Sequence, residues 1–277
     1  MVSYNDLTKT LHAFGLGRDI PVIAHIGADL PGKVKGGLST FMGALLSTVD
    51  NVLLPAFTFS TMVIPQHGPP DNAMQYGEND EQNMRAAIFS HNLPSECGNQ
   101  DAIDILNGFP GVYRSGHPIF SFYGLGLDIA LLNHHPDETY FPIRKMRELH
   151  GWVLLADVEA DRNFSMHYAE MLAGRKQFLR WALTANGAVA CPYFPGCSNG
   201  FHKLDYYLHN ELHKSVMENL TLSAVPLETL ITTTIALLKE DPFALLCNDL
   251  DCVRCNLVRK DAKQKVSGHW QPENRNR

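Results

Sequence analysis

Short apolar runs and helical repeats of apolar residues follow one another along this chain. Apolar runs over residues 20–26, 52–59 and 152–156 predict buried strands. Apolar residues at helical spacing predict helices over residues 5–14, 39–48, 99–107, 125–132, 142–149 and 226–239. The first strand, the glycine-containing turn after it and the next helix make one βα unit.

The second half of the chain adds antiparallel strands to this pattern. Residues 178–183 and 188–193 predict the arms of a hairpin, because Asn186-Gly187 is a favoured hairpin turn. A further strand is expected over residues 215–222. We expect one domain over residues 1–264, followed by a polar tail over residues 265–277.

Composition narrows the class of partner. The chain has 277 residues and a formal net charge of -6, which disfavours nucleic acid and favours cationic or neutral partners. The N-terminus lacks a basic segment followed by an apolar one, and no apolar run reaches about 18 residues. We therefore expect a cytoplasmic protein without a membrane partner, whose six cysteines are reduced.

A histidine and a glutamate follow the strand at residues 152–156 and are the first candidates for chemistry. After a polar turn, Asp161, Asn163 and Ser165 are all suitable helix N-caps. In a helix that begins near Ser165, His167 and Glu170 share one face. The positive end of the helix disfavours imidazolium, and Glu170 would stabilise the cation after proton uptake. The alternative is a solvated pair on an amphipathic helix.

Two further segments could bind a phosphate or a carbonyl oxygen. The Gly36-Gly37 pair precedes Ser39 and Thr40 where a helix N-terminus could accept such a group, although on its own the pair favours a simple tight turn. In the stretch from residue 111 to 126, Arg114, Ser115 and His117 stand beside an apolar run. An arginine there can hold a phosphate bidentately, or a carboxylate in a structural bridge.

Acidic residues in a long irregular segment suggest a cationic ligand. Residues 60–93 are rich in proline and polar residues, and they include Asp71 and Glu78. These carboxylates could face a cationic substrate or could simply be solvated.

Cysteines near the C-terminus have the close spacing of metal ligands. Cys247, Cys252 and Cys255 lie within nine residues, and Cys191 and Cys197 precede them. Four of them, Cys197, Cys247, Cys252 and Cys255, could form a structural zinc site remote from His167 that ties the C-terminal segment to the hairpin. Reduced, partly buried thiols are the alternative.

Several of these segments together resemble one family. The strand with His25, the Gly36-Gly37 turn, PGVYRSGHPIFSF from Pro110, VLLADVEADRNFSMHYAE and FPGCSNGF occur in this order. The series resembles the aminoglycoside 3-N-acetyltransferase family over residues 22–243. Order and spacing make it more specific than any one motif.

The resemblance implies a fold, an activity and site residues. The fold is antibiotic N-acetyltransferase-like and α/β, with helices flanking a central mixed sheet and a C-terminal antiparallel part, unlike the common GNAT transferases. The activity is acetyl transfer from acetyl-CoA to the 3-amino group of a deoxystreptamine aminoglycoside, which is a small cationic amine. His167 matches the catalytic histidine and Glu170 its helix partner. The expected acetyl-CoA pocket is His25, Gly36, Gly37, Ser39, Thr40, Arg114, Ser115 and His117, and the expected substrate residues are Asp71, Glu78, Asp161 and Asn163.

The chemistry agrees with that role. An amine on a polycation is mostly protonated at pH 7, so a base such as His167 must remove a proton before attack on the thioester. Backbone N–H groups in a glycine-rich turn would stabilise the oxyanion. We expect direct transfer in a ternary complex, because no cysteine lies beside a base in these motifs. Acidic residues would hold the remaining ammonium groups.

Two departures from the family pattern bear on the substrate. His25-Ile26-Gly27 replaces a histidine followed by two serines, so a hydroxyl contact near the cofactor is absent. Phe164 stands where the family has threonine, which could alter the shape of the substrate pocket.

The sequence alone leaves other interpretations of the function open. The acceptor could instead be an amino sugar or another small amine, and the chain could be a non-catalytic CoA-binding homologue. A cysteine-nucleophile enzyme and a homodimer are further options that the sequence leaves undecided.

Overall fold

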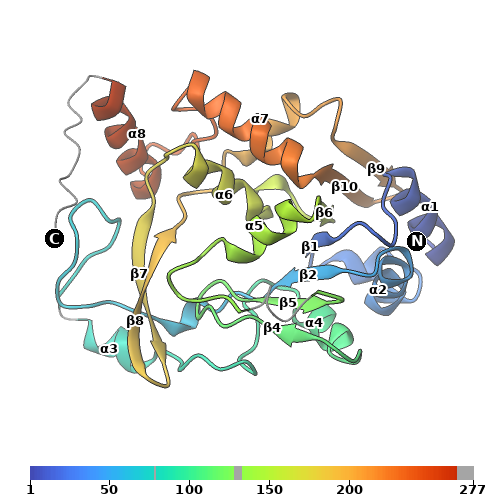
Figure 1. Ribbon diagram of the computed structural model, residues 1–277, viewed down its shortest axis with the longest axis horizontal. Coiled ribbons are helices and arrows are strands. Elements are labelled where there is room, and N and C mark those ends of the chain that lie inside the picture. Colours follow the sequence, from blue (N-terminus) through green and yellow to red (C-terminus); the bar gives the residue numbers. More distant parts are fainter. Residues whose placement is uncertain (78, 128–132, 267–277) are drawn as a thin grey trace.

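A computed structural model describes residues 1–77, 79–127 and 133–266 of the chain (Figure 1). The helices are α1 (Tyr4–Ala13), α2 (Gly37–Thr48), α3 (Asp80–Met84), α4 (Gln100–Leu106), α5 (Phe141–Glu148), α6 (Ser165–Leu172), α7 (Leu227–Glu240) and α8 (Val253–Val266). The strands are β1 (Val22–Ile26), β2 (Val52–Pro55), β3 (Met62–Val63), β4 (Tyr113–Arg114), β5 (Phe122–Leu125), β6 (Trp152–Ala156), β7 (Phe178–Thr184), β8 (Gly187–Phe194), β9 (His213–Met217) and β10 (Leu220–Pro226).

The main sheet is mixed and has its parallel strands at the centre. Its order is β4-β5-β2-β1-β6-β10-β9, in which β1 pairs in parallel with both β2 and β6, and the outer pairs are antiparallel. Every residue of β1 and β2 is buried, as expected for strands covered on both faces. The expected mixed α/β fold is confirmed.

Helices cover both faces of this sheet, and alternation along the strands separates two cores. Ile23, Leu53 and Val153 point to one core, where they meet apolar residues of α5, α6 and α7. Their strand neighbours point to the other core, which α1, α2 and α4 cover. Figure 1 shows these two groups of helices on opposite sides of the central strands.

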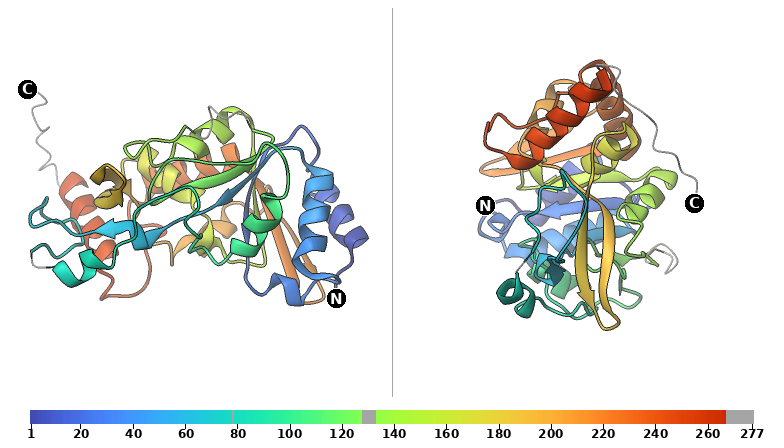
Figure 2. Two further views of the ribbon diagram at one scale, coloured as in Figure 1. Left: turned by 90° about the horizontal axis from the view of Figure 1, so that it is seen from below. Right: turned by 90° about the vertical axis from the view of Figure 1, so that its left-hand side faces the viewer.

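A second sheet stands apart from the first. It has the order β3-β7-β8. The expected β7–β8 hairpin is confirmed, but its turn lies at residues 185–186, one residue before the expected Asn186-Gly187, because Gly187 already pairs with Thr184. Figure 2 shows this end of the molecule, with α3 and α8, opposite the end that α1 and α2 form. Nowhere in the described ranges does a helix have the length and apolar character needed to span a membrane.

Some sequence-based boundaries were wrong. The strand expected over residues 215–222 is two strands, β9 and β10, because the chain turns at Glu218 with a φ of 53°. The helix expected over residues 125–132 begins at Leu125, which is the last residue of β5, and residues 128–132 lie outside the described part. Helix α8 was missed, and it includes Lys265 of the expected tail; residues 267–277 lie outside the described part.

Candidate active site

A cavity of about 890 Å³ opens beyond the carboxyl ends of the three parallel strands. The segments that follow β1, β2 and β6 contribute residues 27–29, Phe57, residues 157–159 and residues 161–162 to its lining. In open α/β sheets, ligands commonly bind at this edge, where several strand ends deliver side chains to one place. The remaining walls come from residues 96–99, from residues 194–199 and from the start of α8.

His167 reaches this cavity from the first turn of α6. The chain turns at residues 160–162 after β6, and Asn163 Oδ1 accepts a hydrogen bond from the Ser165 N–H at 3.2 Å. Of the three N-cap candidates, Asn163 therefore supports the helix start, although the cap position itself falls on Phe164. His167 is only 6% exposed, so a ligand can contact its side chain only from within the cavity.

Glu170 and Arg175 form a chain of ion pairs and hydrogen bonds that holds the His167 imidazole in place. His167 Nδ1 lies 2.7 Å from Glu170 Oε2, and Arg175 Nη1 lies 2.7 Å from Glu170 Oε1. Arg175 also donates to the carbonyl oxygens of Pro242 and Ala244 at 2.9 and 2.6 Å. The alternative of a solvated His–Glu pair is wrong, because both side chains are buried.

The contacts of Glu170 keep its carboxylate ionised and determine which nitrogen of neutral His167 carries the proton. Burial alone would raise the pKa of Glu170, but the hydrogen bond from His167 and the Arg175 charge outweigh it, and the pKa is lowered. An ionised carboxylate only accepts, so in neutral His167 the proton sits on Nδ1. Nε2 is then the unprotonated nitrogen, which is the form that a general base requires.

Aromatic side chains form the wall beside His167. The Phe164 ring lies 4.7 Å from the rings of both Phe57 and Phe120, and its centroid is 5.8 Å from the His167 ring in an edge-on arrangement. Phe201 packs on His167 from another side at 4.7 Å. The rings leave the imidazole little freedom to rotate.

Carboxylates border the cavity. Asp29, Glu159 and Asp161 line it, are exposed, and form no ion pair with any residue in the described ranges. Two others are already engaged: Asp157 pairs with Lys33 at 2.7 Å, and Glu96 accepts from the Ser60 N–H at 3.0 Å. Three unpaired carboxylates on one rim favour a cationic ligand.

His25 also lines the cavity, from the end of β1. Burial, with a smaller contribution from the Arg162 charge, lowers its pKa to about 4. Its Nε2 is buried and has no hydrogen-bond partner. An unpartnered polar atom in a cavity wall can serve a ligand, because leaving it unpaired is unfavourable.

Arg114, Ser115 and His117 come together, but behind the cavity wall. Arg114 is buried and donates to Ser121 Oγ at 3.0 Å and to the carbonyl oxygens of Ala56 (2.8 Å), His91 (3.2 Å) and Leu93. With its donors so occupied and its side chain outside the cavity lining, it cannot grip a phosphate there. Its role in this structure is to join the strand ends to residues 91–93.

The two neighbours of Arg114 are equally committed. Ser115 Oγ accepts from the Phe122 N–H at 2.8 Å. His117 Nδ1 accepts from the N–H groups of Ile119 and Phe120 at 3.1 and 3.0 Å, so its proton must be on Nε2. Burial, with His134 nearby, places the pKa of His117 well below its usual value. The network fixes the loop that carries Phe120 into the cavity.

The remaining expected residues lie away from His167. Gly36 and Gly37 begin α2 with φ values of 85° and 68°, and neither they nor Ser39 and Thr40 line the cavity. A Cβ on Gly36 would lie 2.4 Å from Thr40 Oγ1, so the pair serves a tight turn.

The four residues expected to bind the substrate do not lie together. Asp161 lines the cavity, whereas Asp71 pairs with Lys260 at 2.6 Å outside it. Asn163 lines a second cavity of about 320 Å³ that shares Asp29 and residues 157–159 with the first. Glu78 lies outside the described residues.

The four cysteines of the expected metal site do come together. The sulfur atoms of Cys197, Cys247, Cys252 and Cys255 all lie within 4.8 Å of one another. Two of them, Cys197 and Cys252, line the same large cavity as His167.

Sequence reasoning missed several residues of the site. Arg175 lies beyond the end of α6, so helical spacing could not connect it with Glu170. Asp29 and Glu159 each follow a predicted strand, and this position was the signal that could have found them.

Comparisons with known proteins agree with the family resemblance. Residues 23–238 match the model of the family described as aminoglycoside 3-N-acetyltransferase. The chain is 26% identical over 172 residues to the SPbeta prophage-derived aminoglycoside N(3')-acetyltransferase-like protein YokD of Bacillus subtilis (strain 168), which covers 59% of this chain and 63% of the relative. It is 28% identical over 183 residues to aminoglycoside N(3)-acetyltransferase IX of Micromonospora chalcea, with coverage of 62% and 63%. The matches thus span less than two thirds of either relative.

Solved structures share the fold. The crystal structure of YokD from Bacillus subtilis has a TM-score of 0.71 at 19% identity, covering 87% of this chain and 94% of that one. AAC-IIIb in a binary complex with CoASH has a TM-score of 0.67 at 20% identity, with coverage of 86% and 97%. AAC-VIa bound to sisomicin has a TM-score of 0.65 at 18% identity, with coverage of 86% and 97%.

Proposed function

Because the chain belongs to the aminoglycoside 3-N-acetyltransferase family, we propose that it transfers an acetyl group from acetyl-CoA to an amine, with the 3-amino group of a deoxystreptamine aminoglycoside as the first candidate acceptor. The observation that carries the proposal is the 2.7 Å hydrogen bond from His167 to Glu170 at the wall of a large cavity. The CoASH complex of AAC-IIIb and the sisomicin complex of AAC-VIa support the choice of both substrates.

In the proposed reaction, His167 is the general base. The acceptor reacts in its free-amine form: Nε2 takes a proton from the nitrogen as that nitrogen attacks the thioester carbonyl carbon, and a tetrahedral oxyanion forms. The intermediate collapses with cleavage of the C–S bond, and CoA leaves as a thiolate. The proton on the imidazolium can then pass to that thiolate, which gives an amide and CoASH and restores neutral His167. Glu170 stabilises the transient imidazolium.

Direct transfer in a ternary complex suits the cysteines of the cavity. Cys97 lines it, and burial raises the pKa of its thiol, so little thiolate is present at pH 7. Cys197 and Cys252 are held in the four-cysteine cluster. A covalent acetyl-cysteine step would need a thiol in contact with the base, and among the described residues the side-chain hydrogen bond of His167 goes to Glu170.

Charges on the rim suit the two proposed substrates. Asp29, Glu159 and Asp161 would hold the other ammonium groups of a polycationic acceptor. Arg162 and Arg254 line the same cavity and are the proposed contacts for the phosphates of acetyl-CoA. His25 remains a proposed cofactor contact through its unpartnered Nε2. Acetyl-CoA is a cytoplasmic metabolite, so we place the reaction in the cytoplasm.

The test is an acceptor screen with purified protein. Acetyl-CoA is supplied with deoxystreptamine aminoglycosides, amino sugars and simple polyamines, and both free CoA and the mass of the acetylated product are followed. We expect turnover with at least one deoxystreptamine acceptor, and loss of about a hundredfold or more in kcat for His167→Ala. His209→Ala, an exposed histidine outside the cavity, is the matched control and should keep wild-type kcat.

The outcomes separate the alternatives. Turnover confined to amino sugars would replace the aminoglycoside as acceptor but keep acetyl transfer. If calorimetry shows that acetyl-CoA binds but no amine is acetylated, the proposal of an enzyme is refuted and a CoA-binding homologue is left. An acetylated cysteine in the absence of acceptor would refute direct transfer.

A further inference from the structure

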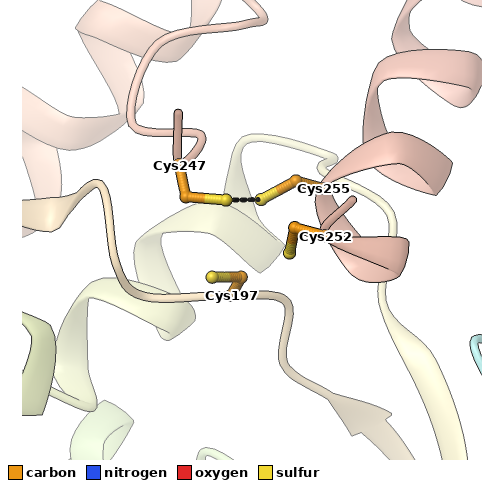
Figure 3. Close-up of side chains that lie close together, drawn as sticks. All are labelled: Cys197, Cys247, Cys252 and Cys255. Atoms are coloured by element: carbon orange, nitrogen blue, oxygen red, sulfur yellow. Dashed lines mark hydrogen bonds between the residues drawn. The ribbon is translucent and has the colours of Figure 1, made fainter. Parts of the chain in front are cut away.

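Four cysteines from three separate segments converge at one end of the molecule. Cys197 lies on the loop after β8, Cys247 follows α7, and Cys252 and Cys255 stand at the beginning of α8 (Figure 3). Figure 3 shows all four sulfur atoms turned toward one another. The aminoglycoside acetyl-transfer chemistry proposed above uses none of them.

The spacing of the sulfur atoms is that of a tetrahedral thiolate site. With Zn–S bonds of about 2.3 Å, a regular tetrahedron places each pair of sulfurs about 3.8 Å apart. Here Cys247 Sγ and Cys255 Sγ are 3.4 Å apart, and no pair in the cluster exceeds 4.8 Å. Adjustments of side-chain torsions alone can therefore bring all four sulfurs to one ion.

The surroundings also suit thiolates. Cys197, Cys247 and Cys255 are 8%, 4% and 1% exposed, so the ligands are shielded from water. Cys252 directly precedes α8, and the positive end of that helix faces the cluster.

Basic side chains hold the ligand-bearing segments in place. Arg259 donates to the Cys247 carbonyl oxygen at 2.6 Å, and Arg254 donates to the Gly196 carbonyl oxygen at 3.0 Å. Lys203 donates to the Leu246 carbonyl oxygen at 2.8 Å. These cations can also offset the net charge of -2 that four thiolates and one divalent ion would carry.

The segments that carry Cys197 and Cys247 approach one another closely. A Cβ on Gly200 would lie 2.3 Å from the Leu245 carbonyl oxygen, so only glycine allows this contact. The loop after β8 and the segment before Cys247 are thus already packed together. A preformed site of this kind needs little rearrangement to bind.

We propose that Cys197, Cys247, Cys252 and Cys255 bind one structural Zn²⁺ ion. Binding releases up to four protons as the thiols become thiolates, and no electron is transferred. Zinc suits this set because four sulfur ligands in a closed tetrahedron are typical of structural zinc, whereas calcium and magnesium require oxygen ligands. Cys252 and Cys255 supply the paired C-x-x-C spacing, and Cys197 and Cys247 complete the site from elsewhere in the chain.

The ion has a consequence for the cavity. Cys197 and Cys252 line it together with Pro195, Gly196 and Arg254, so the zinc would fix this part of the cavity wall. It would join the loop after β8 to α8, two segments that no strand pairing connects. Its role is to position this wall, and it takes no part in proton transfer.

The first test is the metal content of wild-type protein purified without chelators from zinc-supplemented medium. We expect one zinc per chain by elemental mass spectrometry, and six thiols after denaturation with chelator. A Cys247–Cys255 disulfide would leave four thiols, and six thiols without bound metal would mean an empty cluster; either result overturns the proposal. Iron in place of zinc would overturn the identity of the ion.

Variants then assign the ligands. Cys255→Ser and Cys252→Ser should each lower the zinc content roughly tenfold, because serine is a poor zinc ligand. Cys191→Ser is the matched control: it is a buried cysteine of β8 outside the cluster and should keep one zinc per chain. Where a variant does not fold, cobalt titration of metal-stripped wild-type protein replaces it. Visible bands typical of tetrahedral thiolate cobalt are expected, and their absence would contradict four-sulfur ligation.

This test is independent of the acetyltransferase assignment. Zinc content and cobalt spectra do not require turnover, so the metal site can fail while acetyl transfer is observed. The converse outcome, a zinc protein without acetyl transfer, would refute only the proposed function.

Discussion

Replacement of Glu170 by glutamine tests the proposed base most directly, because it changes charge but hardly changes size. Glu170 has two oxygen atoms, and each accepts a hydrogen bond at 2.7 Å, one from His167 and one from Arg175. An amide offers a single acceptor oxygen, and its nitrogen can only donate. Glu170→Gln therefore cannot serve both donors at once.

Because residue 170 is buried, both orientations of the glutamine amide are unfavourable. If the amide oxygen keeps Arg175, the amide NH₂ faces His167 Nδ1, and the ring must carry its proton on Nε2. That tautomer cannot accept a proton at the cavity. If the oxygen keeps His167, the NH₂ faces a buried guanidinium that has lost its counter-charge.

The expected cost follows from these contacts. Two charge-assisted hydrogen bonds are weakened and Arg175 loses its carboxylate, although it keeps two carbonyl acceptors. We expect the free energy of unfolding to fall by about 2–4 kcal/mol. We expect kcat for acetyl transfer to fall roughly 10²–10⁴-fold, which is the usual contribution of a general base.

The assay combines kinetics with unfolding. Steady-state kcat and KM are measured with the best acceptor from the screen, and stability is measured by urea denaturation of the same preparations. Arg175→Met is the control, since it removes the buried cation but leaves the His167–Glu170 hydrogen bond. It should lose similar stability and keep kcat within about tenfold. If folded Glu170→Gln retains wild-type kcat, the base assignment through this pair is refuted.

Three further predictions concern the same cavity. The pKa of His25 is lowered from 6.5 to about 4, so as the pH falls the unfolded chain takes up this proton before the folded protein does. The free energy of unfolding should therefore fall by roughly 3 kcal/mol between pH 7 and pH 4. Urea denaturation at these two pH values should show a smaller fall for His25→Gln than for the wild type. Phe164→Ala should lower the free energy of unfolding by about 3–5 kcal/mol, because it empties a site between Phe57 and Phe120; a loss below about 1 kcal/mol in urea would contradict this packing. Asp161→Asn should raise KM for a polycationic acceptor several-fold with kcat unchanged, an effect that should shrink at high salt; a fall in kcat alone would argue against a binding role.

The parts of the fold that sequence could predict are those in which local pattern and final environment agree. Strand β6 is a short apolar run and is buried, and α6 begins within a few residues of its predicted N-caps. His167 and Glu170 share a helix face at three-residue spacing, which geometry alone brings into contact. For these elements, no knowledge of distant residues was needed.

The parts that sequence could not predict depend on distant partners. Arg114 was expected at a phosphate, yet its guanidinium lies among carbonyl oxygens of residues that are up to 58 positions away. The sequence alone cannot tell which acceptors an arginine will meet. Helix α8 was missed because its buried face is Cys255, Val258 and Ala262, small residues among many charged ones.

The site combines two parts of the chain that differ in their relation to the family. His167, Glu170 and the strand ends lie within residues 23–238, which match the family model. Cys247, Cys252 and Arg254 lie beyond those residues, yet Cys252 and Arg254 line the same cavity. In the proposed reaction the acetyl group moves only a short distance between thioester and amine, and the proposed base, His167, is held by the sheet and α6. In the proposed complex, Asp29, Glu159 and Asp161 hold the rest of the acceptor, and Arg254 of the α8 wall contacts the phosphates of acetyl-CoA. Differences in acceptor choice within this fold are therefore expected to follow these carboxylates and Phe164 more than the His167–Glu170 pair.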